Sequence, residues 1–459
     1  MKNNSFRILF ILTAAAGMFV TACPIEYTPE SGYRSGKYGD FQWYSRNGEV
    51  TISGYTGQGG DVIIPAVIDK KPVTVIGYSS FRESENLISI TIPKGVKYIE
   101  HSAFYRCTEL ADVNLPESLT LIGDWSFTHC GSLTGIALPD SVTSIGEYAF
   151  HNCRGITDIA IPDNVEYIGK AAFDSCTGLT GITIPDSVIG IGERAFSGCP
   201  DLETIDVSSG STRFSSADGI LYSKDFHTLV AYPNGRKGIA AIPDDVTSIG
   251  DYAFDSCREL TGIIIPDSVI TIGFYAFSGC SNLDTISVDS DNTKFSSLDG
   301  ILYSKDFSTL FVCPNGKEGI ATITDSVTRI HNSAFAGCTK LTSINIPDGI
   351  TSIEDNTFAS CRMLSGITIP GSVTSIRNGA FWWCENLTSI TIPENVASIE
   401  SNAFLVCTSL ASVTFAGNKI SSPDFSYNAF NGNLREQYLT GGIGTYIRLD
   451  SSYNWTKQY

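Results

Sequence analysis

One pattern of apolar residues recurs with a 23-residue period over most of this chain, as from Pro116 to Pro139 and on to Pro162. Its clearest copy runs from Leu133 to Cys153, and the copies on either side keep the same phase. Repetition of one unit at this spacing is typical of solenoids, so the chain is expected to fold as a stack of similar rungs. Two markers follow the spacing: prolines at Pro93, Pro116, Pro139, Pro162, Pro185, Pro243, Pro266, Pro347, Pro370 and Pro393, and phenylalanines at Phe104, Phe127, Phe150, Phe173, Phe196, Phe254, Phe277, Phe335, Phe358, Phe381 and Phe404.

Each copy consists of one short strand and a return segment. Leu387, Ile390 and Ile392 show the Leu-x-x-Leu-x-Leu spacing of a leucine-rich repeat strand, and Pro393 ends the strand because it lacks a backbone N–H donor. A single copy has too few apolar side chains to offset the entropy lost on ordering its backbone, so its stability must come from stacking. We therefore predict an α/β-type repeat solenoid over residues 81–415 with a parallel strand ladder.

Two insertions, at about 207–241 and 288–322, interrupt the spacing. They match each other, since Phe214–Phe226 and Phe295–Phe307 share the sequence Asp-Gly-Ile-Leu-Tyr-Ser-Lys-Asp. Tight-turn dipeptides such as Asp-Gly between short β-prone runs favour a hairpin. We expect each insertion to be a β-hairpin that protrudes from the solenoid.

The two ends of the chain depart from the repeat. Residues 38–80 and 416–459 show alternating and turn-rich patterns, which we interpret as β-type caps that cover the first and last rungs. Residues 23–37 are rich in Pro, Gly, Ser, Glu and Tyr, and we interpret them as a tether.

Residues 1–22 have the pattern of a signal peptide: a positive start and an apolar run too short to span a bilayer. The run ends in Val20-Thr21-Ala22-Cys23, which resembles a bacterial lipobox with Val20 where leucine is usual. The resemblance implies that Cys23 carries a lipid and anchors the exported protein to a membrane. Ordinary cleavage after Ala22 is the alternative.

The repeat as a whole resembles the BspA-like leucine-rich repeats of bacterial cell-surface proteins. The segment from Ile184 to Leu202 nearly spells the phrase Ile-Pro-x-Ser-Val-Thr-x-Ile-Gly-x-x-Ala-Phe-x-x-Cys-x-x-Leu, and the resemblance covers roughly residues 75–415. It implies a protein exposed at the cell surface or outer membrane. It also implies adhesion to host matrix proteins such as fibronectin and fibrinogen, or coaggregation between bacteria.

No motif in the sequence indicates catalysis. Eleven of the 13 cysteines occupy one position of the repeat, which predicts a row of buried free thiols, and none has the close Cys-x-x-Cys spacing of a metal site. His129 and His151 occupy neighbouring rungs, where a shared metal or two plain surface positions are the alternatives, and we favour the latter. We expect no enzyme activity, no cofactor and no metal.

The charge of the chain also limits its partners. A formal net charge of −18 argues against nucleic acid, because phosphate binding requires clustered Lys and Arg. The residues that point outward from the repeat strands, such as Ser89, Thr91, Asp112 and Asn114, should form a smooth concave face that is uncharged to acidic and suited to weak, multivalent contacts.

Aromatic residues at variable positions of the repeat are the candidate binding residues. Trp382 and Trp383 replace a small polar pair, and either a binding hot spot or local packing would explain them. A broken aromatic edge is expected at Trp125, Tyr148, Tyr252 and Tyr275. The first hypothesis is an adhesin-like protein that binds protein or glycan ligands, and the alternative is a self-associating structural protein.

Overall fold

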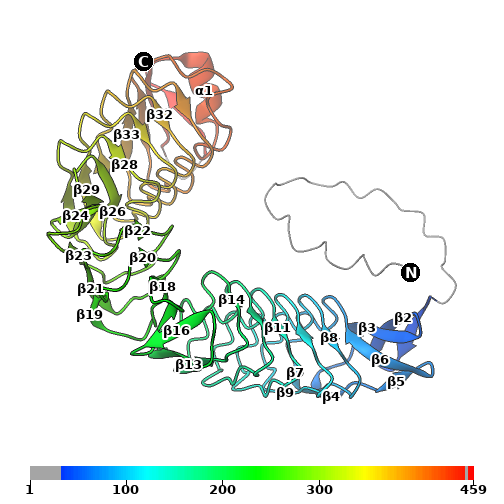
Figure 1. Ribbon diagram of the computed structural model, residues 1–459. Helices are drawn as coiled ribbons and strands as arrows, with labels where there is room; N and C mark the ends of the chain where they lie inside the picture. The colour runs from blue at the N-terminus through cyan, green and yellow to red at the C-terminus, as the bar shows by residue number, and fades with distance from the viewer. Residues whose placement is uncertain (1–32, 450–452, 459) are drawn as a thin grey trace, which may run out of the picture.

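The computed structural model describes residues 33–449 and 453–458, which form a long β-solenoid bent into two arms (Figure 1). The predicted signal peptide, Cys23 and most of the tether lie outside the described residues. Within the described part, the only α-helix is α1 (Leu434–Gly441), which lies beyond the repeats. The α/β-type prediction was therefore wrong in its helical part, because tight turns occupy the return segment of each rung.

The longer repeat strands pair in parallel along one side of the rungs and fall into five successive sheets, here together called ladder A. Its register follows the repeat, since Ile90 pairs with Val113 and Ile182 with Ile205, each at the equivalent position of the next rung. Its strands are β4 (Gly60–Ile63), β7 (Leu87–Thr91), β9 (Asp112–Asn114), β13 (Gly181–Ile184), β15 (Thr204–Val207), β19 (Gly238–Ala241), β21 (Leu260–Ile265), β23 (Thr285–Val288), β27 (Gly319–Thr322), β29 (Leu341–Asn345), β31 (Gly366–Ile367), β33 (Ser389–Ile392) and β35 (Ser412–Phe415).

A second parallel ladder, here called ladder B, is built from two-residue strands in the return segments. Ile122 pairs with Ile145, and Ile145 with Ile168, so this ladder has the same register. Its strands are β8 (Tyr98–Ile99), β10 (Leu121–Ile122), β11 (Ser144–Ile145), β12 (Tyr167–Ile168), β14 (Gly190–Ile191), β20 (Ser248–Ile249), β22 (Thr271–Ile272), β28 (Arg329–Ile330), β30 (Ser352–Ile353), β32 (Ser375–Ile376) and β34 (Ser398–Ile399).

A column of stacked phenylalanine rings fills the space beside the ladders. Successive rings lie 5.1 Å apart from Phe104 to Phe127 and 4.9 Å apart from Phe381 to Phe404, measured between centroids. These side chains are buried, as are the inward-facing isoleucines of ladder A, such as Ile90 and Ile182, and most isoleucines of ladder B, such as Ile122 and Ile145. Offset aromatic stacking adds to the free energy gained by removing the rings from water.

The two insertions belong to enlarged rungs that join the solenoid at both ladders. In the first, β16 (Phe214–Ala217) pairs antiparallel with β17 (Ile220–Ser223), and β17 pairs antiparallel with β18 (Thr228–Ala231). β18 then pairs in parallel with β20 and so enters ladder B. The second repeats this arrangement with β24 (Phe295–Leu298), β25 (Ile301–Ser304) and β26 (Thr309–Val312).

The insertions are packed into the molecule. The turn signals had led us to expect that they simply protrude, and this expectation was wrong. Ile220, Leu221 and Tyr222 of β17 are all buried. The hydrophobic core divides here into clusters that meet at Ile220–Leu221 and again at Ile301–Leu302. The solenoid changes direction in the region of β16 to β19 (Figure 1).

The bend places ladder A on its outer side and ladder B towards its inner side (Figure 1). The strands β7 and β9, which carry Ser89, Thr91, Asp112 and Asn114, therefore lie on the outer side of the bend and not on its inner side. The direction of the bend depends on how the enlarged rungs pack, which the strand pattern of an ordinary repeat does not encode.

The first described residues form a small mixed sheet. Its strands are β1 (Arg34–Tyr38), β2 (Phe41–Arg46), β3 (Glu49–Tyr55), β5 (Val67–Ile68) and β6 (Lys71–Ile76), and β6 continues into ladder B by pairing with β8. β1 includes residues 34–37, which the composition had placed in the tether.

At the other end, helix α1 and two strands pack against the last rung. β36 (Gly444–Ile447) pairs antiparallel with β35, and β37 (Thr456–Lys457) pairs with β36. The buried Trp455 donates from Nε1 to the carbonyl of Asn431 at 2.9 Å. The helix is a departure from the purely β-type end that the sequence predicted.

Candidate functional site

Four of the candidate aromatic residues occupy one position of the turn, two residues before the core phenylalanine. Trp125, Tyr148, Tyr252 and Tyr275 have φ angles of 58°, 55°, 56° and 54°. Positive φ is uncommon for bulky residues, because Cβ crowds the backbone. The turn imposes this conformation on whichever side chain occupies the position.

The same position has positive φ throughout the repeats. It is occupied elsewhere by Ser102, Ala171, Arg194, Ser333, Asn356, Gly379 and Asn402. A second such position follows the phenylalanine by two residues and includes Trp383, with a φ of 62°. Our sequence reasoning missed both positions. The signal was the frequent Ser, Asn and Gly on either side of each core phenylalanine.

The predicted aromatic edge consists of two separate stacks. Trp125 and Tyr148 stack with centroids 4.1 Å apart and planes 16° apart, and Tyr252 and Tyr275 stack at 5.4 Å and 13°. The rungs between the two pairs carry Ala171 and Arg194 at this position. Tyr275 is exposed, whereas the other three side chains are half-buried.

Trp382 and Trp383 form a third stack, on a later rung. Their rings lie 4.9 Å apart at 15°, and the guanidinium of Arg362 lies 5.3 Å from the centre of the Trp383 ring. Trp382 is 37% exposed and Trp383 is half-buried. Packing therefore explains Trp383, while Trp382 presents part of a large apolar ring to solvent.

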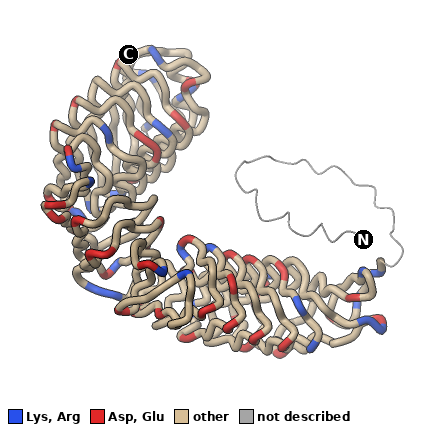
Figure 2. The backbone as a smooth tube through the Cα atoms, in the orientation of Figure 1, with Lys and Arg blue, Asp and Glu red and all other residues tan. Residues whose placement is uncertain are grey.

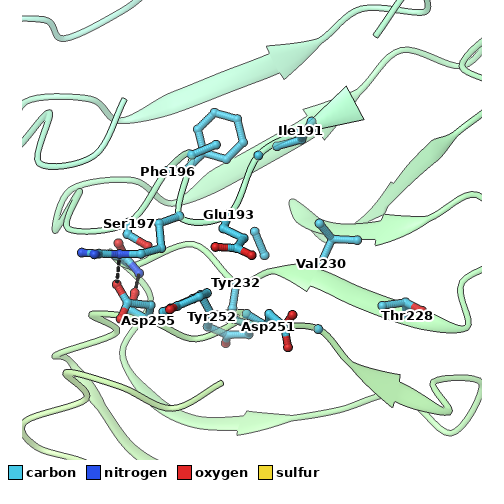
Figure 3. Close-up of a pocket in the computed structure, with 17 residues that line it drawn as sticks. Ile191, Glu193, Phe196, Ser197, Thr228, Val230, Tyr232, Asp251, Tyr252 and Asp255 are labelled. Carbon is cyan, nitrogen blue, oxygen red and sulfur yellow. Dashed lines mark hydrogen bonds and ion pairs between the residues drawn. The ribbon is translucent and has the colours of Figure 1, made fainter. Parts of the chain in front are cut away.

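A small cleft of about 210 Å³ opens at the first enlarged rung, lined by Arg194, Phe196, Tyr232, Tyr252 and Asp255 among others (Figure 3). Arg194 Nη2 lies 3.1 Å from Asp174 Oδ2, and its Nε lies 3.2 Å from Asp255 Oδ2. Burial raises the pKa of Asp255, and the Arg194 charge opposes this shift. This ion pair closes part of the cleft.

The twelve cysteines in the described part of the chain are buried free thiols. Each thiol in the regular rungs donates to the carbonyl of an earlier core phenylalanine, as Cys153 Sγ does to Phe127 O at 3.0 Å. Burial raises the pKa of Cys107 and Cys199 to about 12, which keeps these thiols protonated and unreactive. Cys23 lies outside the described residues.

The two neighbouring histidines contact each other at the edge of the turn stack. The rings of His129 and His151 lie 5.5 Å apart in an edge-to-face arrangement, and burial lowers the pKa of both. His151 Nδ1 lies 3.9 Å from Asp174 Oδ1. Across the described residues, no group of three or more potential metal ligands occurs.

The charged side chains are scattered along both arms (Figure 2). Asp and Glu number 48 and Lys and Arg 30 in the whole chain, and the figure shows no broad basic face. Of the helices in the described part, none is long and apolar enough to cross a membrane.

Comparison with known families identifies the repeat. The model of the BspA type leucine-rich repeat region matches residues 74–203, 239–303 and 313–435, which make up more than half of the chain. The chain belongs to this family. The gaps between the matched segments of this BspA-type protein fall within the two enlarged rungs.

Several solved bacterial structures are similar to this BspA-type protein. A leucine-rich cell surface protein from Faecalibacterium prausnitzii shares 28% identity, with a TM-score of 0.47, and the match covers 87% of this chain and 97% of that one. Leucine-rich repeat proteins from Eubacterium ventriosum and Bacteroides ovatus share 22% and 23% identity, with TM-scores of 0.48 and 0.40. These matches cover 80% and 81% of this chain, and 93% and 95% of the other chains. No curated protein matches the chain.

Proposed function

We propose that this BspA-type protein is a non-enzymatic, adhesin-like binding protein of the bacterial cell surface. Its ligands are other proteins, with host matrix proteins as the first candidates, or glycans, and nucleic acid is not among them. The observation that carries the proposal is the exposed Trp382 ring stacked on Trp383, because partly exposed tryptophans on a rigid scaffold are frequent binding hot spots. The two other aromatic stacks offer further contact points.

The location of the protein forms part of the same proposal. We propose that the chain is exported, that lipid is attached at Cys23 and that this lipid anchors the protein in the outer membrane. The lipobox-like sequence before Cys23 and the family membership support this proposal. Labelling with a radioactive fatty acid, with Cys23→Ser as the control, tests it.

The ends of the solenoid have a protective role in this proposal. The β1–β6 sheet and the α1–β37 segment act as caps that keep the apolar first and last rungs out of water. The buried Trp43 and Trp455 contribute to these two ends.

Self-association is the second candidate function. β1 lies at the edge of its sheet among the described residues, and all five of its residues are exposed. An exposed edge strand can pair with a strand of another molecule. Such pairing would join solenoids end to end, which suits a coaggregation protein.

Binding to immobilised fibronectin and fibrinogen by the full chain tests the first function. We expect saturable binding that a Trp382→Ala/Trp383→Ala double variant reduces at least tenfold. Tyr167→Ala is the matched control, because Tyr167 is 51% exposed but lies in ladder B and belongs to none of the three aromatic stacks. Loss of binding in a Trp125→Ala/Tyr148→Ala variant would instead locate the binding site at the Trp125–Tyr148 stack. If the folded protein binds neither target but self-associates with rising concentration, the second function is correct.

A further inference from the structure

The two enlarged rungs have the same chain course but enclose clefts of very different size. The first cleft measures about 210 Å³ and the second about 670 Å³. The second is lined by Phe274, Tyr275, Phe295, Phe311 and Cys313, together with several polar residues. Because the second insertion and its flanking rungs repeat the first at a constant offset, the two clefts can be compared side chain by side chain.

One substitution removes an aromatic ring from the wall of the second cleft, whereas Phe311 and His331 replace the smaller Val230 and Gly250. Tyr232 in the first rung donates its backbone N–H to Ala253 O at 2.7 Å and stacks on Phe254 at 4.9 Å. Cys313 makes the equivalent backbone bond to Ala334 O, also at 2.7 Å. The short thiol thus stands where the first rung has a phenol ring.

The charged groups of the first cleft are also replaced. Glu193, Arg194 and Asp255 correspond to Phe274, Tyr275 and Ala336 in the second. The Arg194–Asp255 ion pair thus has no counterpart in the second cleft. There, Ser333 Oγ lies 3.5 Å from Tyr275 Oη. Phe274 is 67% exposed and Tyr275 is 45% exposed, so the mouth of the second cleft has two aromatic faces.

A buried acceptor without a partner lines this cleft. Asn234 of the first rung accepts a hydrogen bond from the Cys199 N–H at its Oδ1, at 3.1 Å. Its counterpart Asn315 is 7% exposed and donates from Nδ2 to Ala336 O at 2.7 Å, but its Oδ1 has no partner among the described residues. This acceptor is closed to solvent, so polar contacts to a ligand must come from the other groups that line the cleft.

We propose that the second cleft is a binding site for a neutral saccharide unit. The aromatic faces of Phe274 and Tyr275 suit the C–H face of a sugar ring, and sugar hydroxyls can bond to the polar groups that line the cleft. These groups are mostly hydroxyls and amides, such as Ser278 and Asn332, and the Asp251 carboxylate already accepts the Phe274 N–H at 2.6 Å. Both the volume and the mixture of apolar walls with few polar groups fit a small-molecule site.

This inference rests on the proposed binding function and narrows it to one site and one ligand class. The test uses the full chain and a panel of neutral trisaccharides built from glucose, galactose or N-acetylglucosamine, measured by calorimetric titration. We expect saturable binding of at least one trisaccharide. Cys313→Tyr should reduce the affinity at least tenfold, because it places in the second cleft the tyrosine ring that occupies the equivalent position of the first rung. The mirror variant, Tyr232→Cys, should leave the affinity unchanged.

A second pair of variants controls for folding. Phe274→Ala should weaken binding about tenfold, whereas Tyr78→Ala should not, although Tyr78 occupies the same repeat position and is 64% exposed. If no trisaccharide binds, or if neither Cys313→Tyr nor Phe274→Ala changes the affinity, the proposal is overturned. Binding of a lysine-rich peptide in place of sugars would overturn the ligand class. None of these results depends on the tryptophan pair, so the proposed adhesion to matrix proteins is tested independently.

Discussion

Arg194 Nε lies 3.2 Å from Asp255 Oδ2, although 61 residues and an enlarged rung separate them in the chain. The same guanidinium contacts Asp174 on the preceding rung, and both carboxylates are nearly buried. Arg194 thus connects the two solenoid segments on either side of the bend.

Arg194→Gln should destabilise the protein, because it leaves two buried carboxylates without their cation. We expect the free energy of unfolding at pH 7 to fall by about 1–3 kcal/mol, below the usual cost of breaking a fully buried pair because Arg194 is partly exposed. Burial raises the pKa of Asp255, so the cost should shrink as the pH falls and this carboxyl takes up a proton. Urea unfolding at pH 7 and at lower pH measures the effect.

Lys170→Gln is the matched control for that variant. Lys170 Nζ pairs with Glu193 Oε2 at 3.2 Å on the surface nearby, where ion pairs contribute at most about 1 kcal/mol. Equal losses in the two variants would contradict the role assigned to Arg194.

The buried thiols predict a loss of stability in alkaline solution. Burial raises the pKa of Cys107, Cys199, Cys257 and Cys407 from 9.0 to about 12 in the folded state. The unfolded chain therefore loses these protons first, so the stability is fully present below pH 9 and declines as the pH rises towards 12. The Tm under reducing conditions should fall steadily over this range.

The contribution of one thiol can be isolated. Cys257→Ala should lower the Tm at pH 7 because it leaves a small cavity, yet its Tm should fall less steeply above pH 9 than that of the unsubstituted protein. Parallel pH profiles for the two proteins would rule out thiol ionisation as the cause.

The positive-φ position before each core phenylalanine predicts an unusual effect of glycine. Ala171 has a φ of 50°, where a Cβ atom costs roughly 1–2 kcal/mol. Ala171→Gly should raise the free energy of unfolding by up to about 1 kcal/mol, once the greater freedom of glycine in the unfolded chain is subtracted.

Ala172→Gly provides the comparison at the next residue. Ala172 is buried in the core without positive φ, so its substitution should lower the free energy of unfolding by about 1 kcal/mol. Chemical denaturation of both variants decides the matter, and destabilisation by both would show that the turn tolerates Ala171 without strain.

Arg448 stabilises the last rung through hydrogen bonds to its backbone. It is 6% exposed, and its Nη2 donates to Cys407 O at 3.1 Å and Thr408 O at 2.7 Å. Arg448→Met should leave these carbonyls unpaired, lower the Tm by several degrees and increase aggregation measured by light scattering. The exposed Arg329 is the control, since Arg329→Met should change neither quantity.

The repeat could be predicted from the sequence because successive copies have apolar residues at the same few positions. Ile122, Phe127 and Cys130 are buried at the positions that the repeat spacing assigned to the interior. Because such positions recur in each copy, errors at a single rung do not obscure the pattern.

The irregular parts could not be predicted in the same way. The sequence indicated hairpins at 207–241 and 288–322, but it did not show that β18 and β26 would enter ladder B. That outcome depends on tertiary pairing with β20 and β28. The small side chain of Cys313 became informative only by comparison with Tyr232 at the equivalent position.

The two enlarged rungs give the molecule a second, longer period, which runs from Phe214 to Phe295 and spans several ordinary rungs. Each such unit begins and ends in the same phase of both ladders, so one unit could be duplicated or lost without disturbing the ends. Recombination between the two copies would therefore change the reach of the protein and the number of its clefts in whole steps. A population of bacteria could vary both properties together by altering a single number.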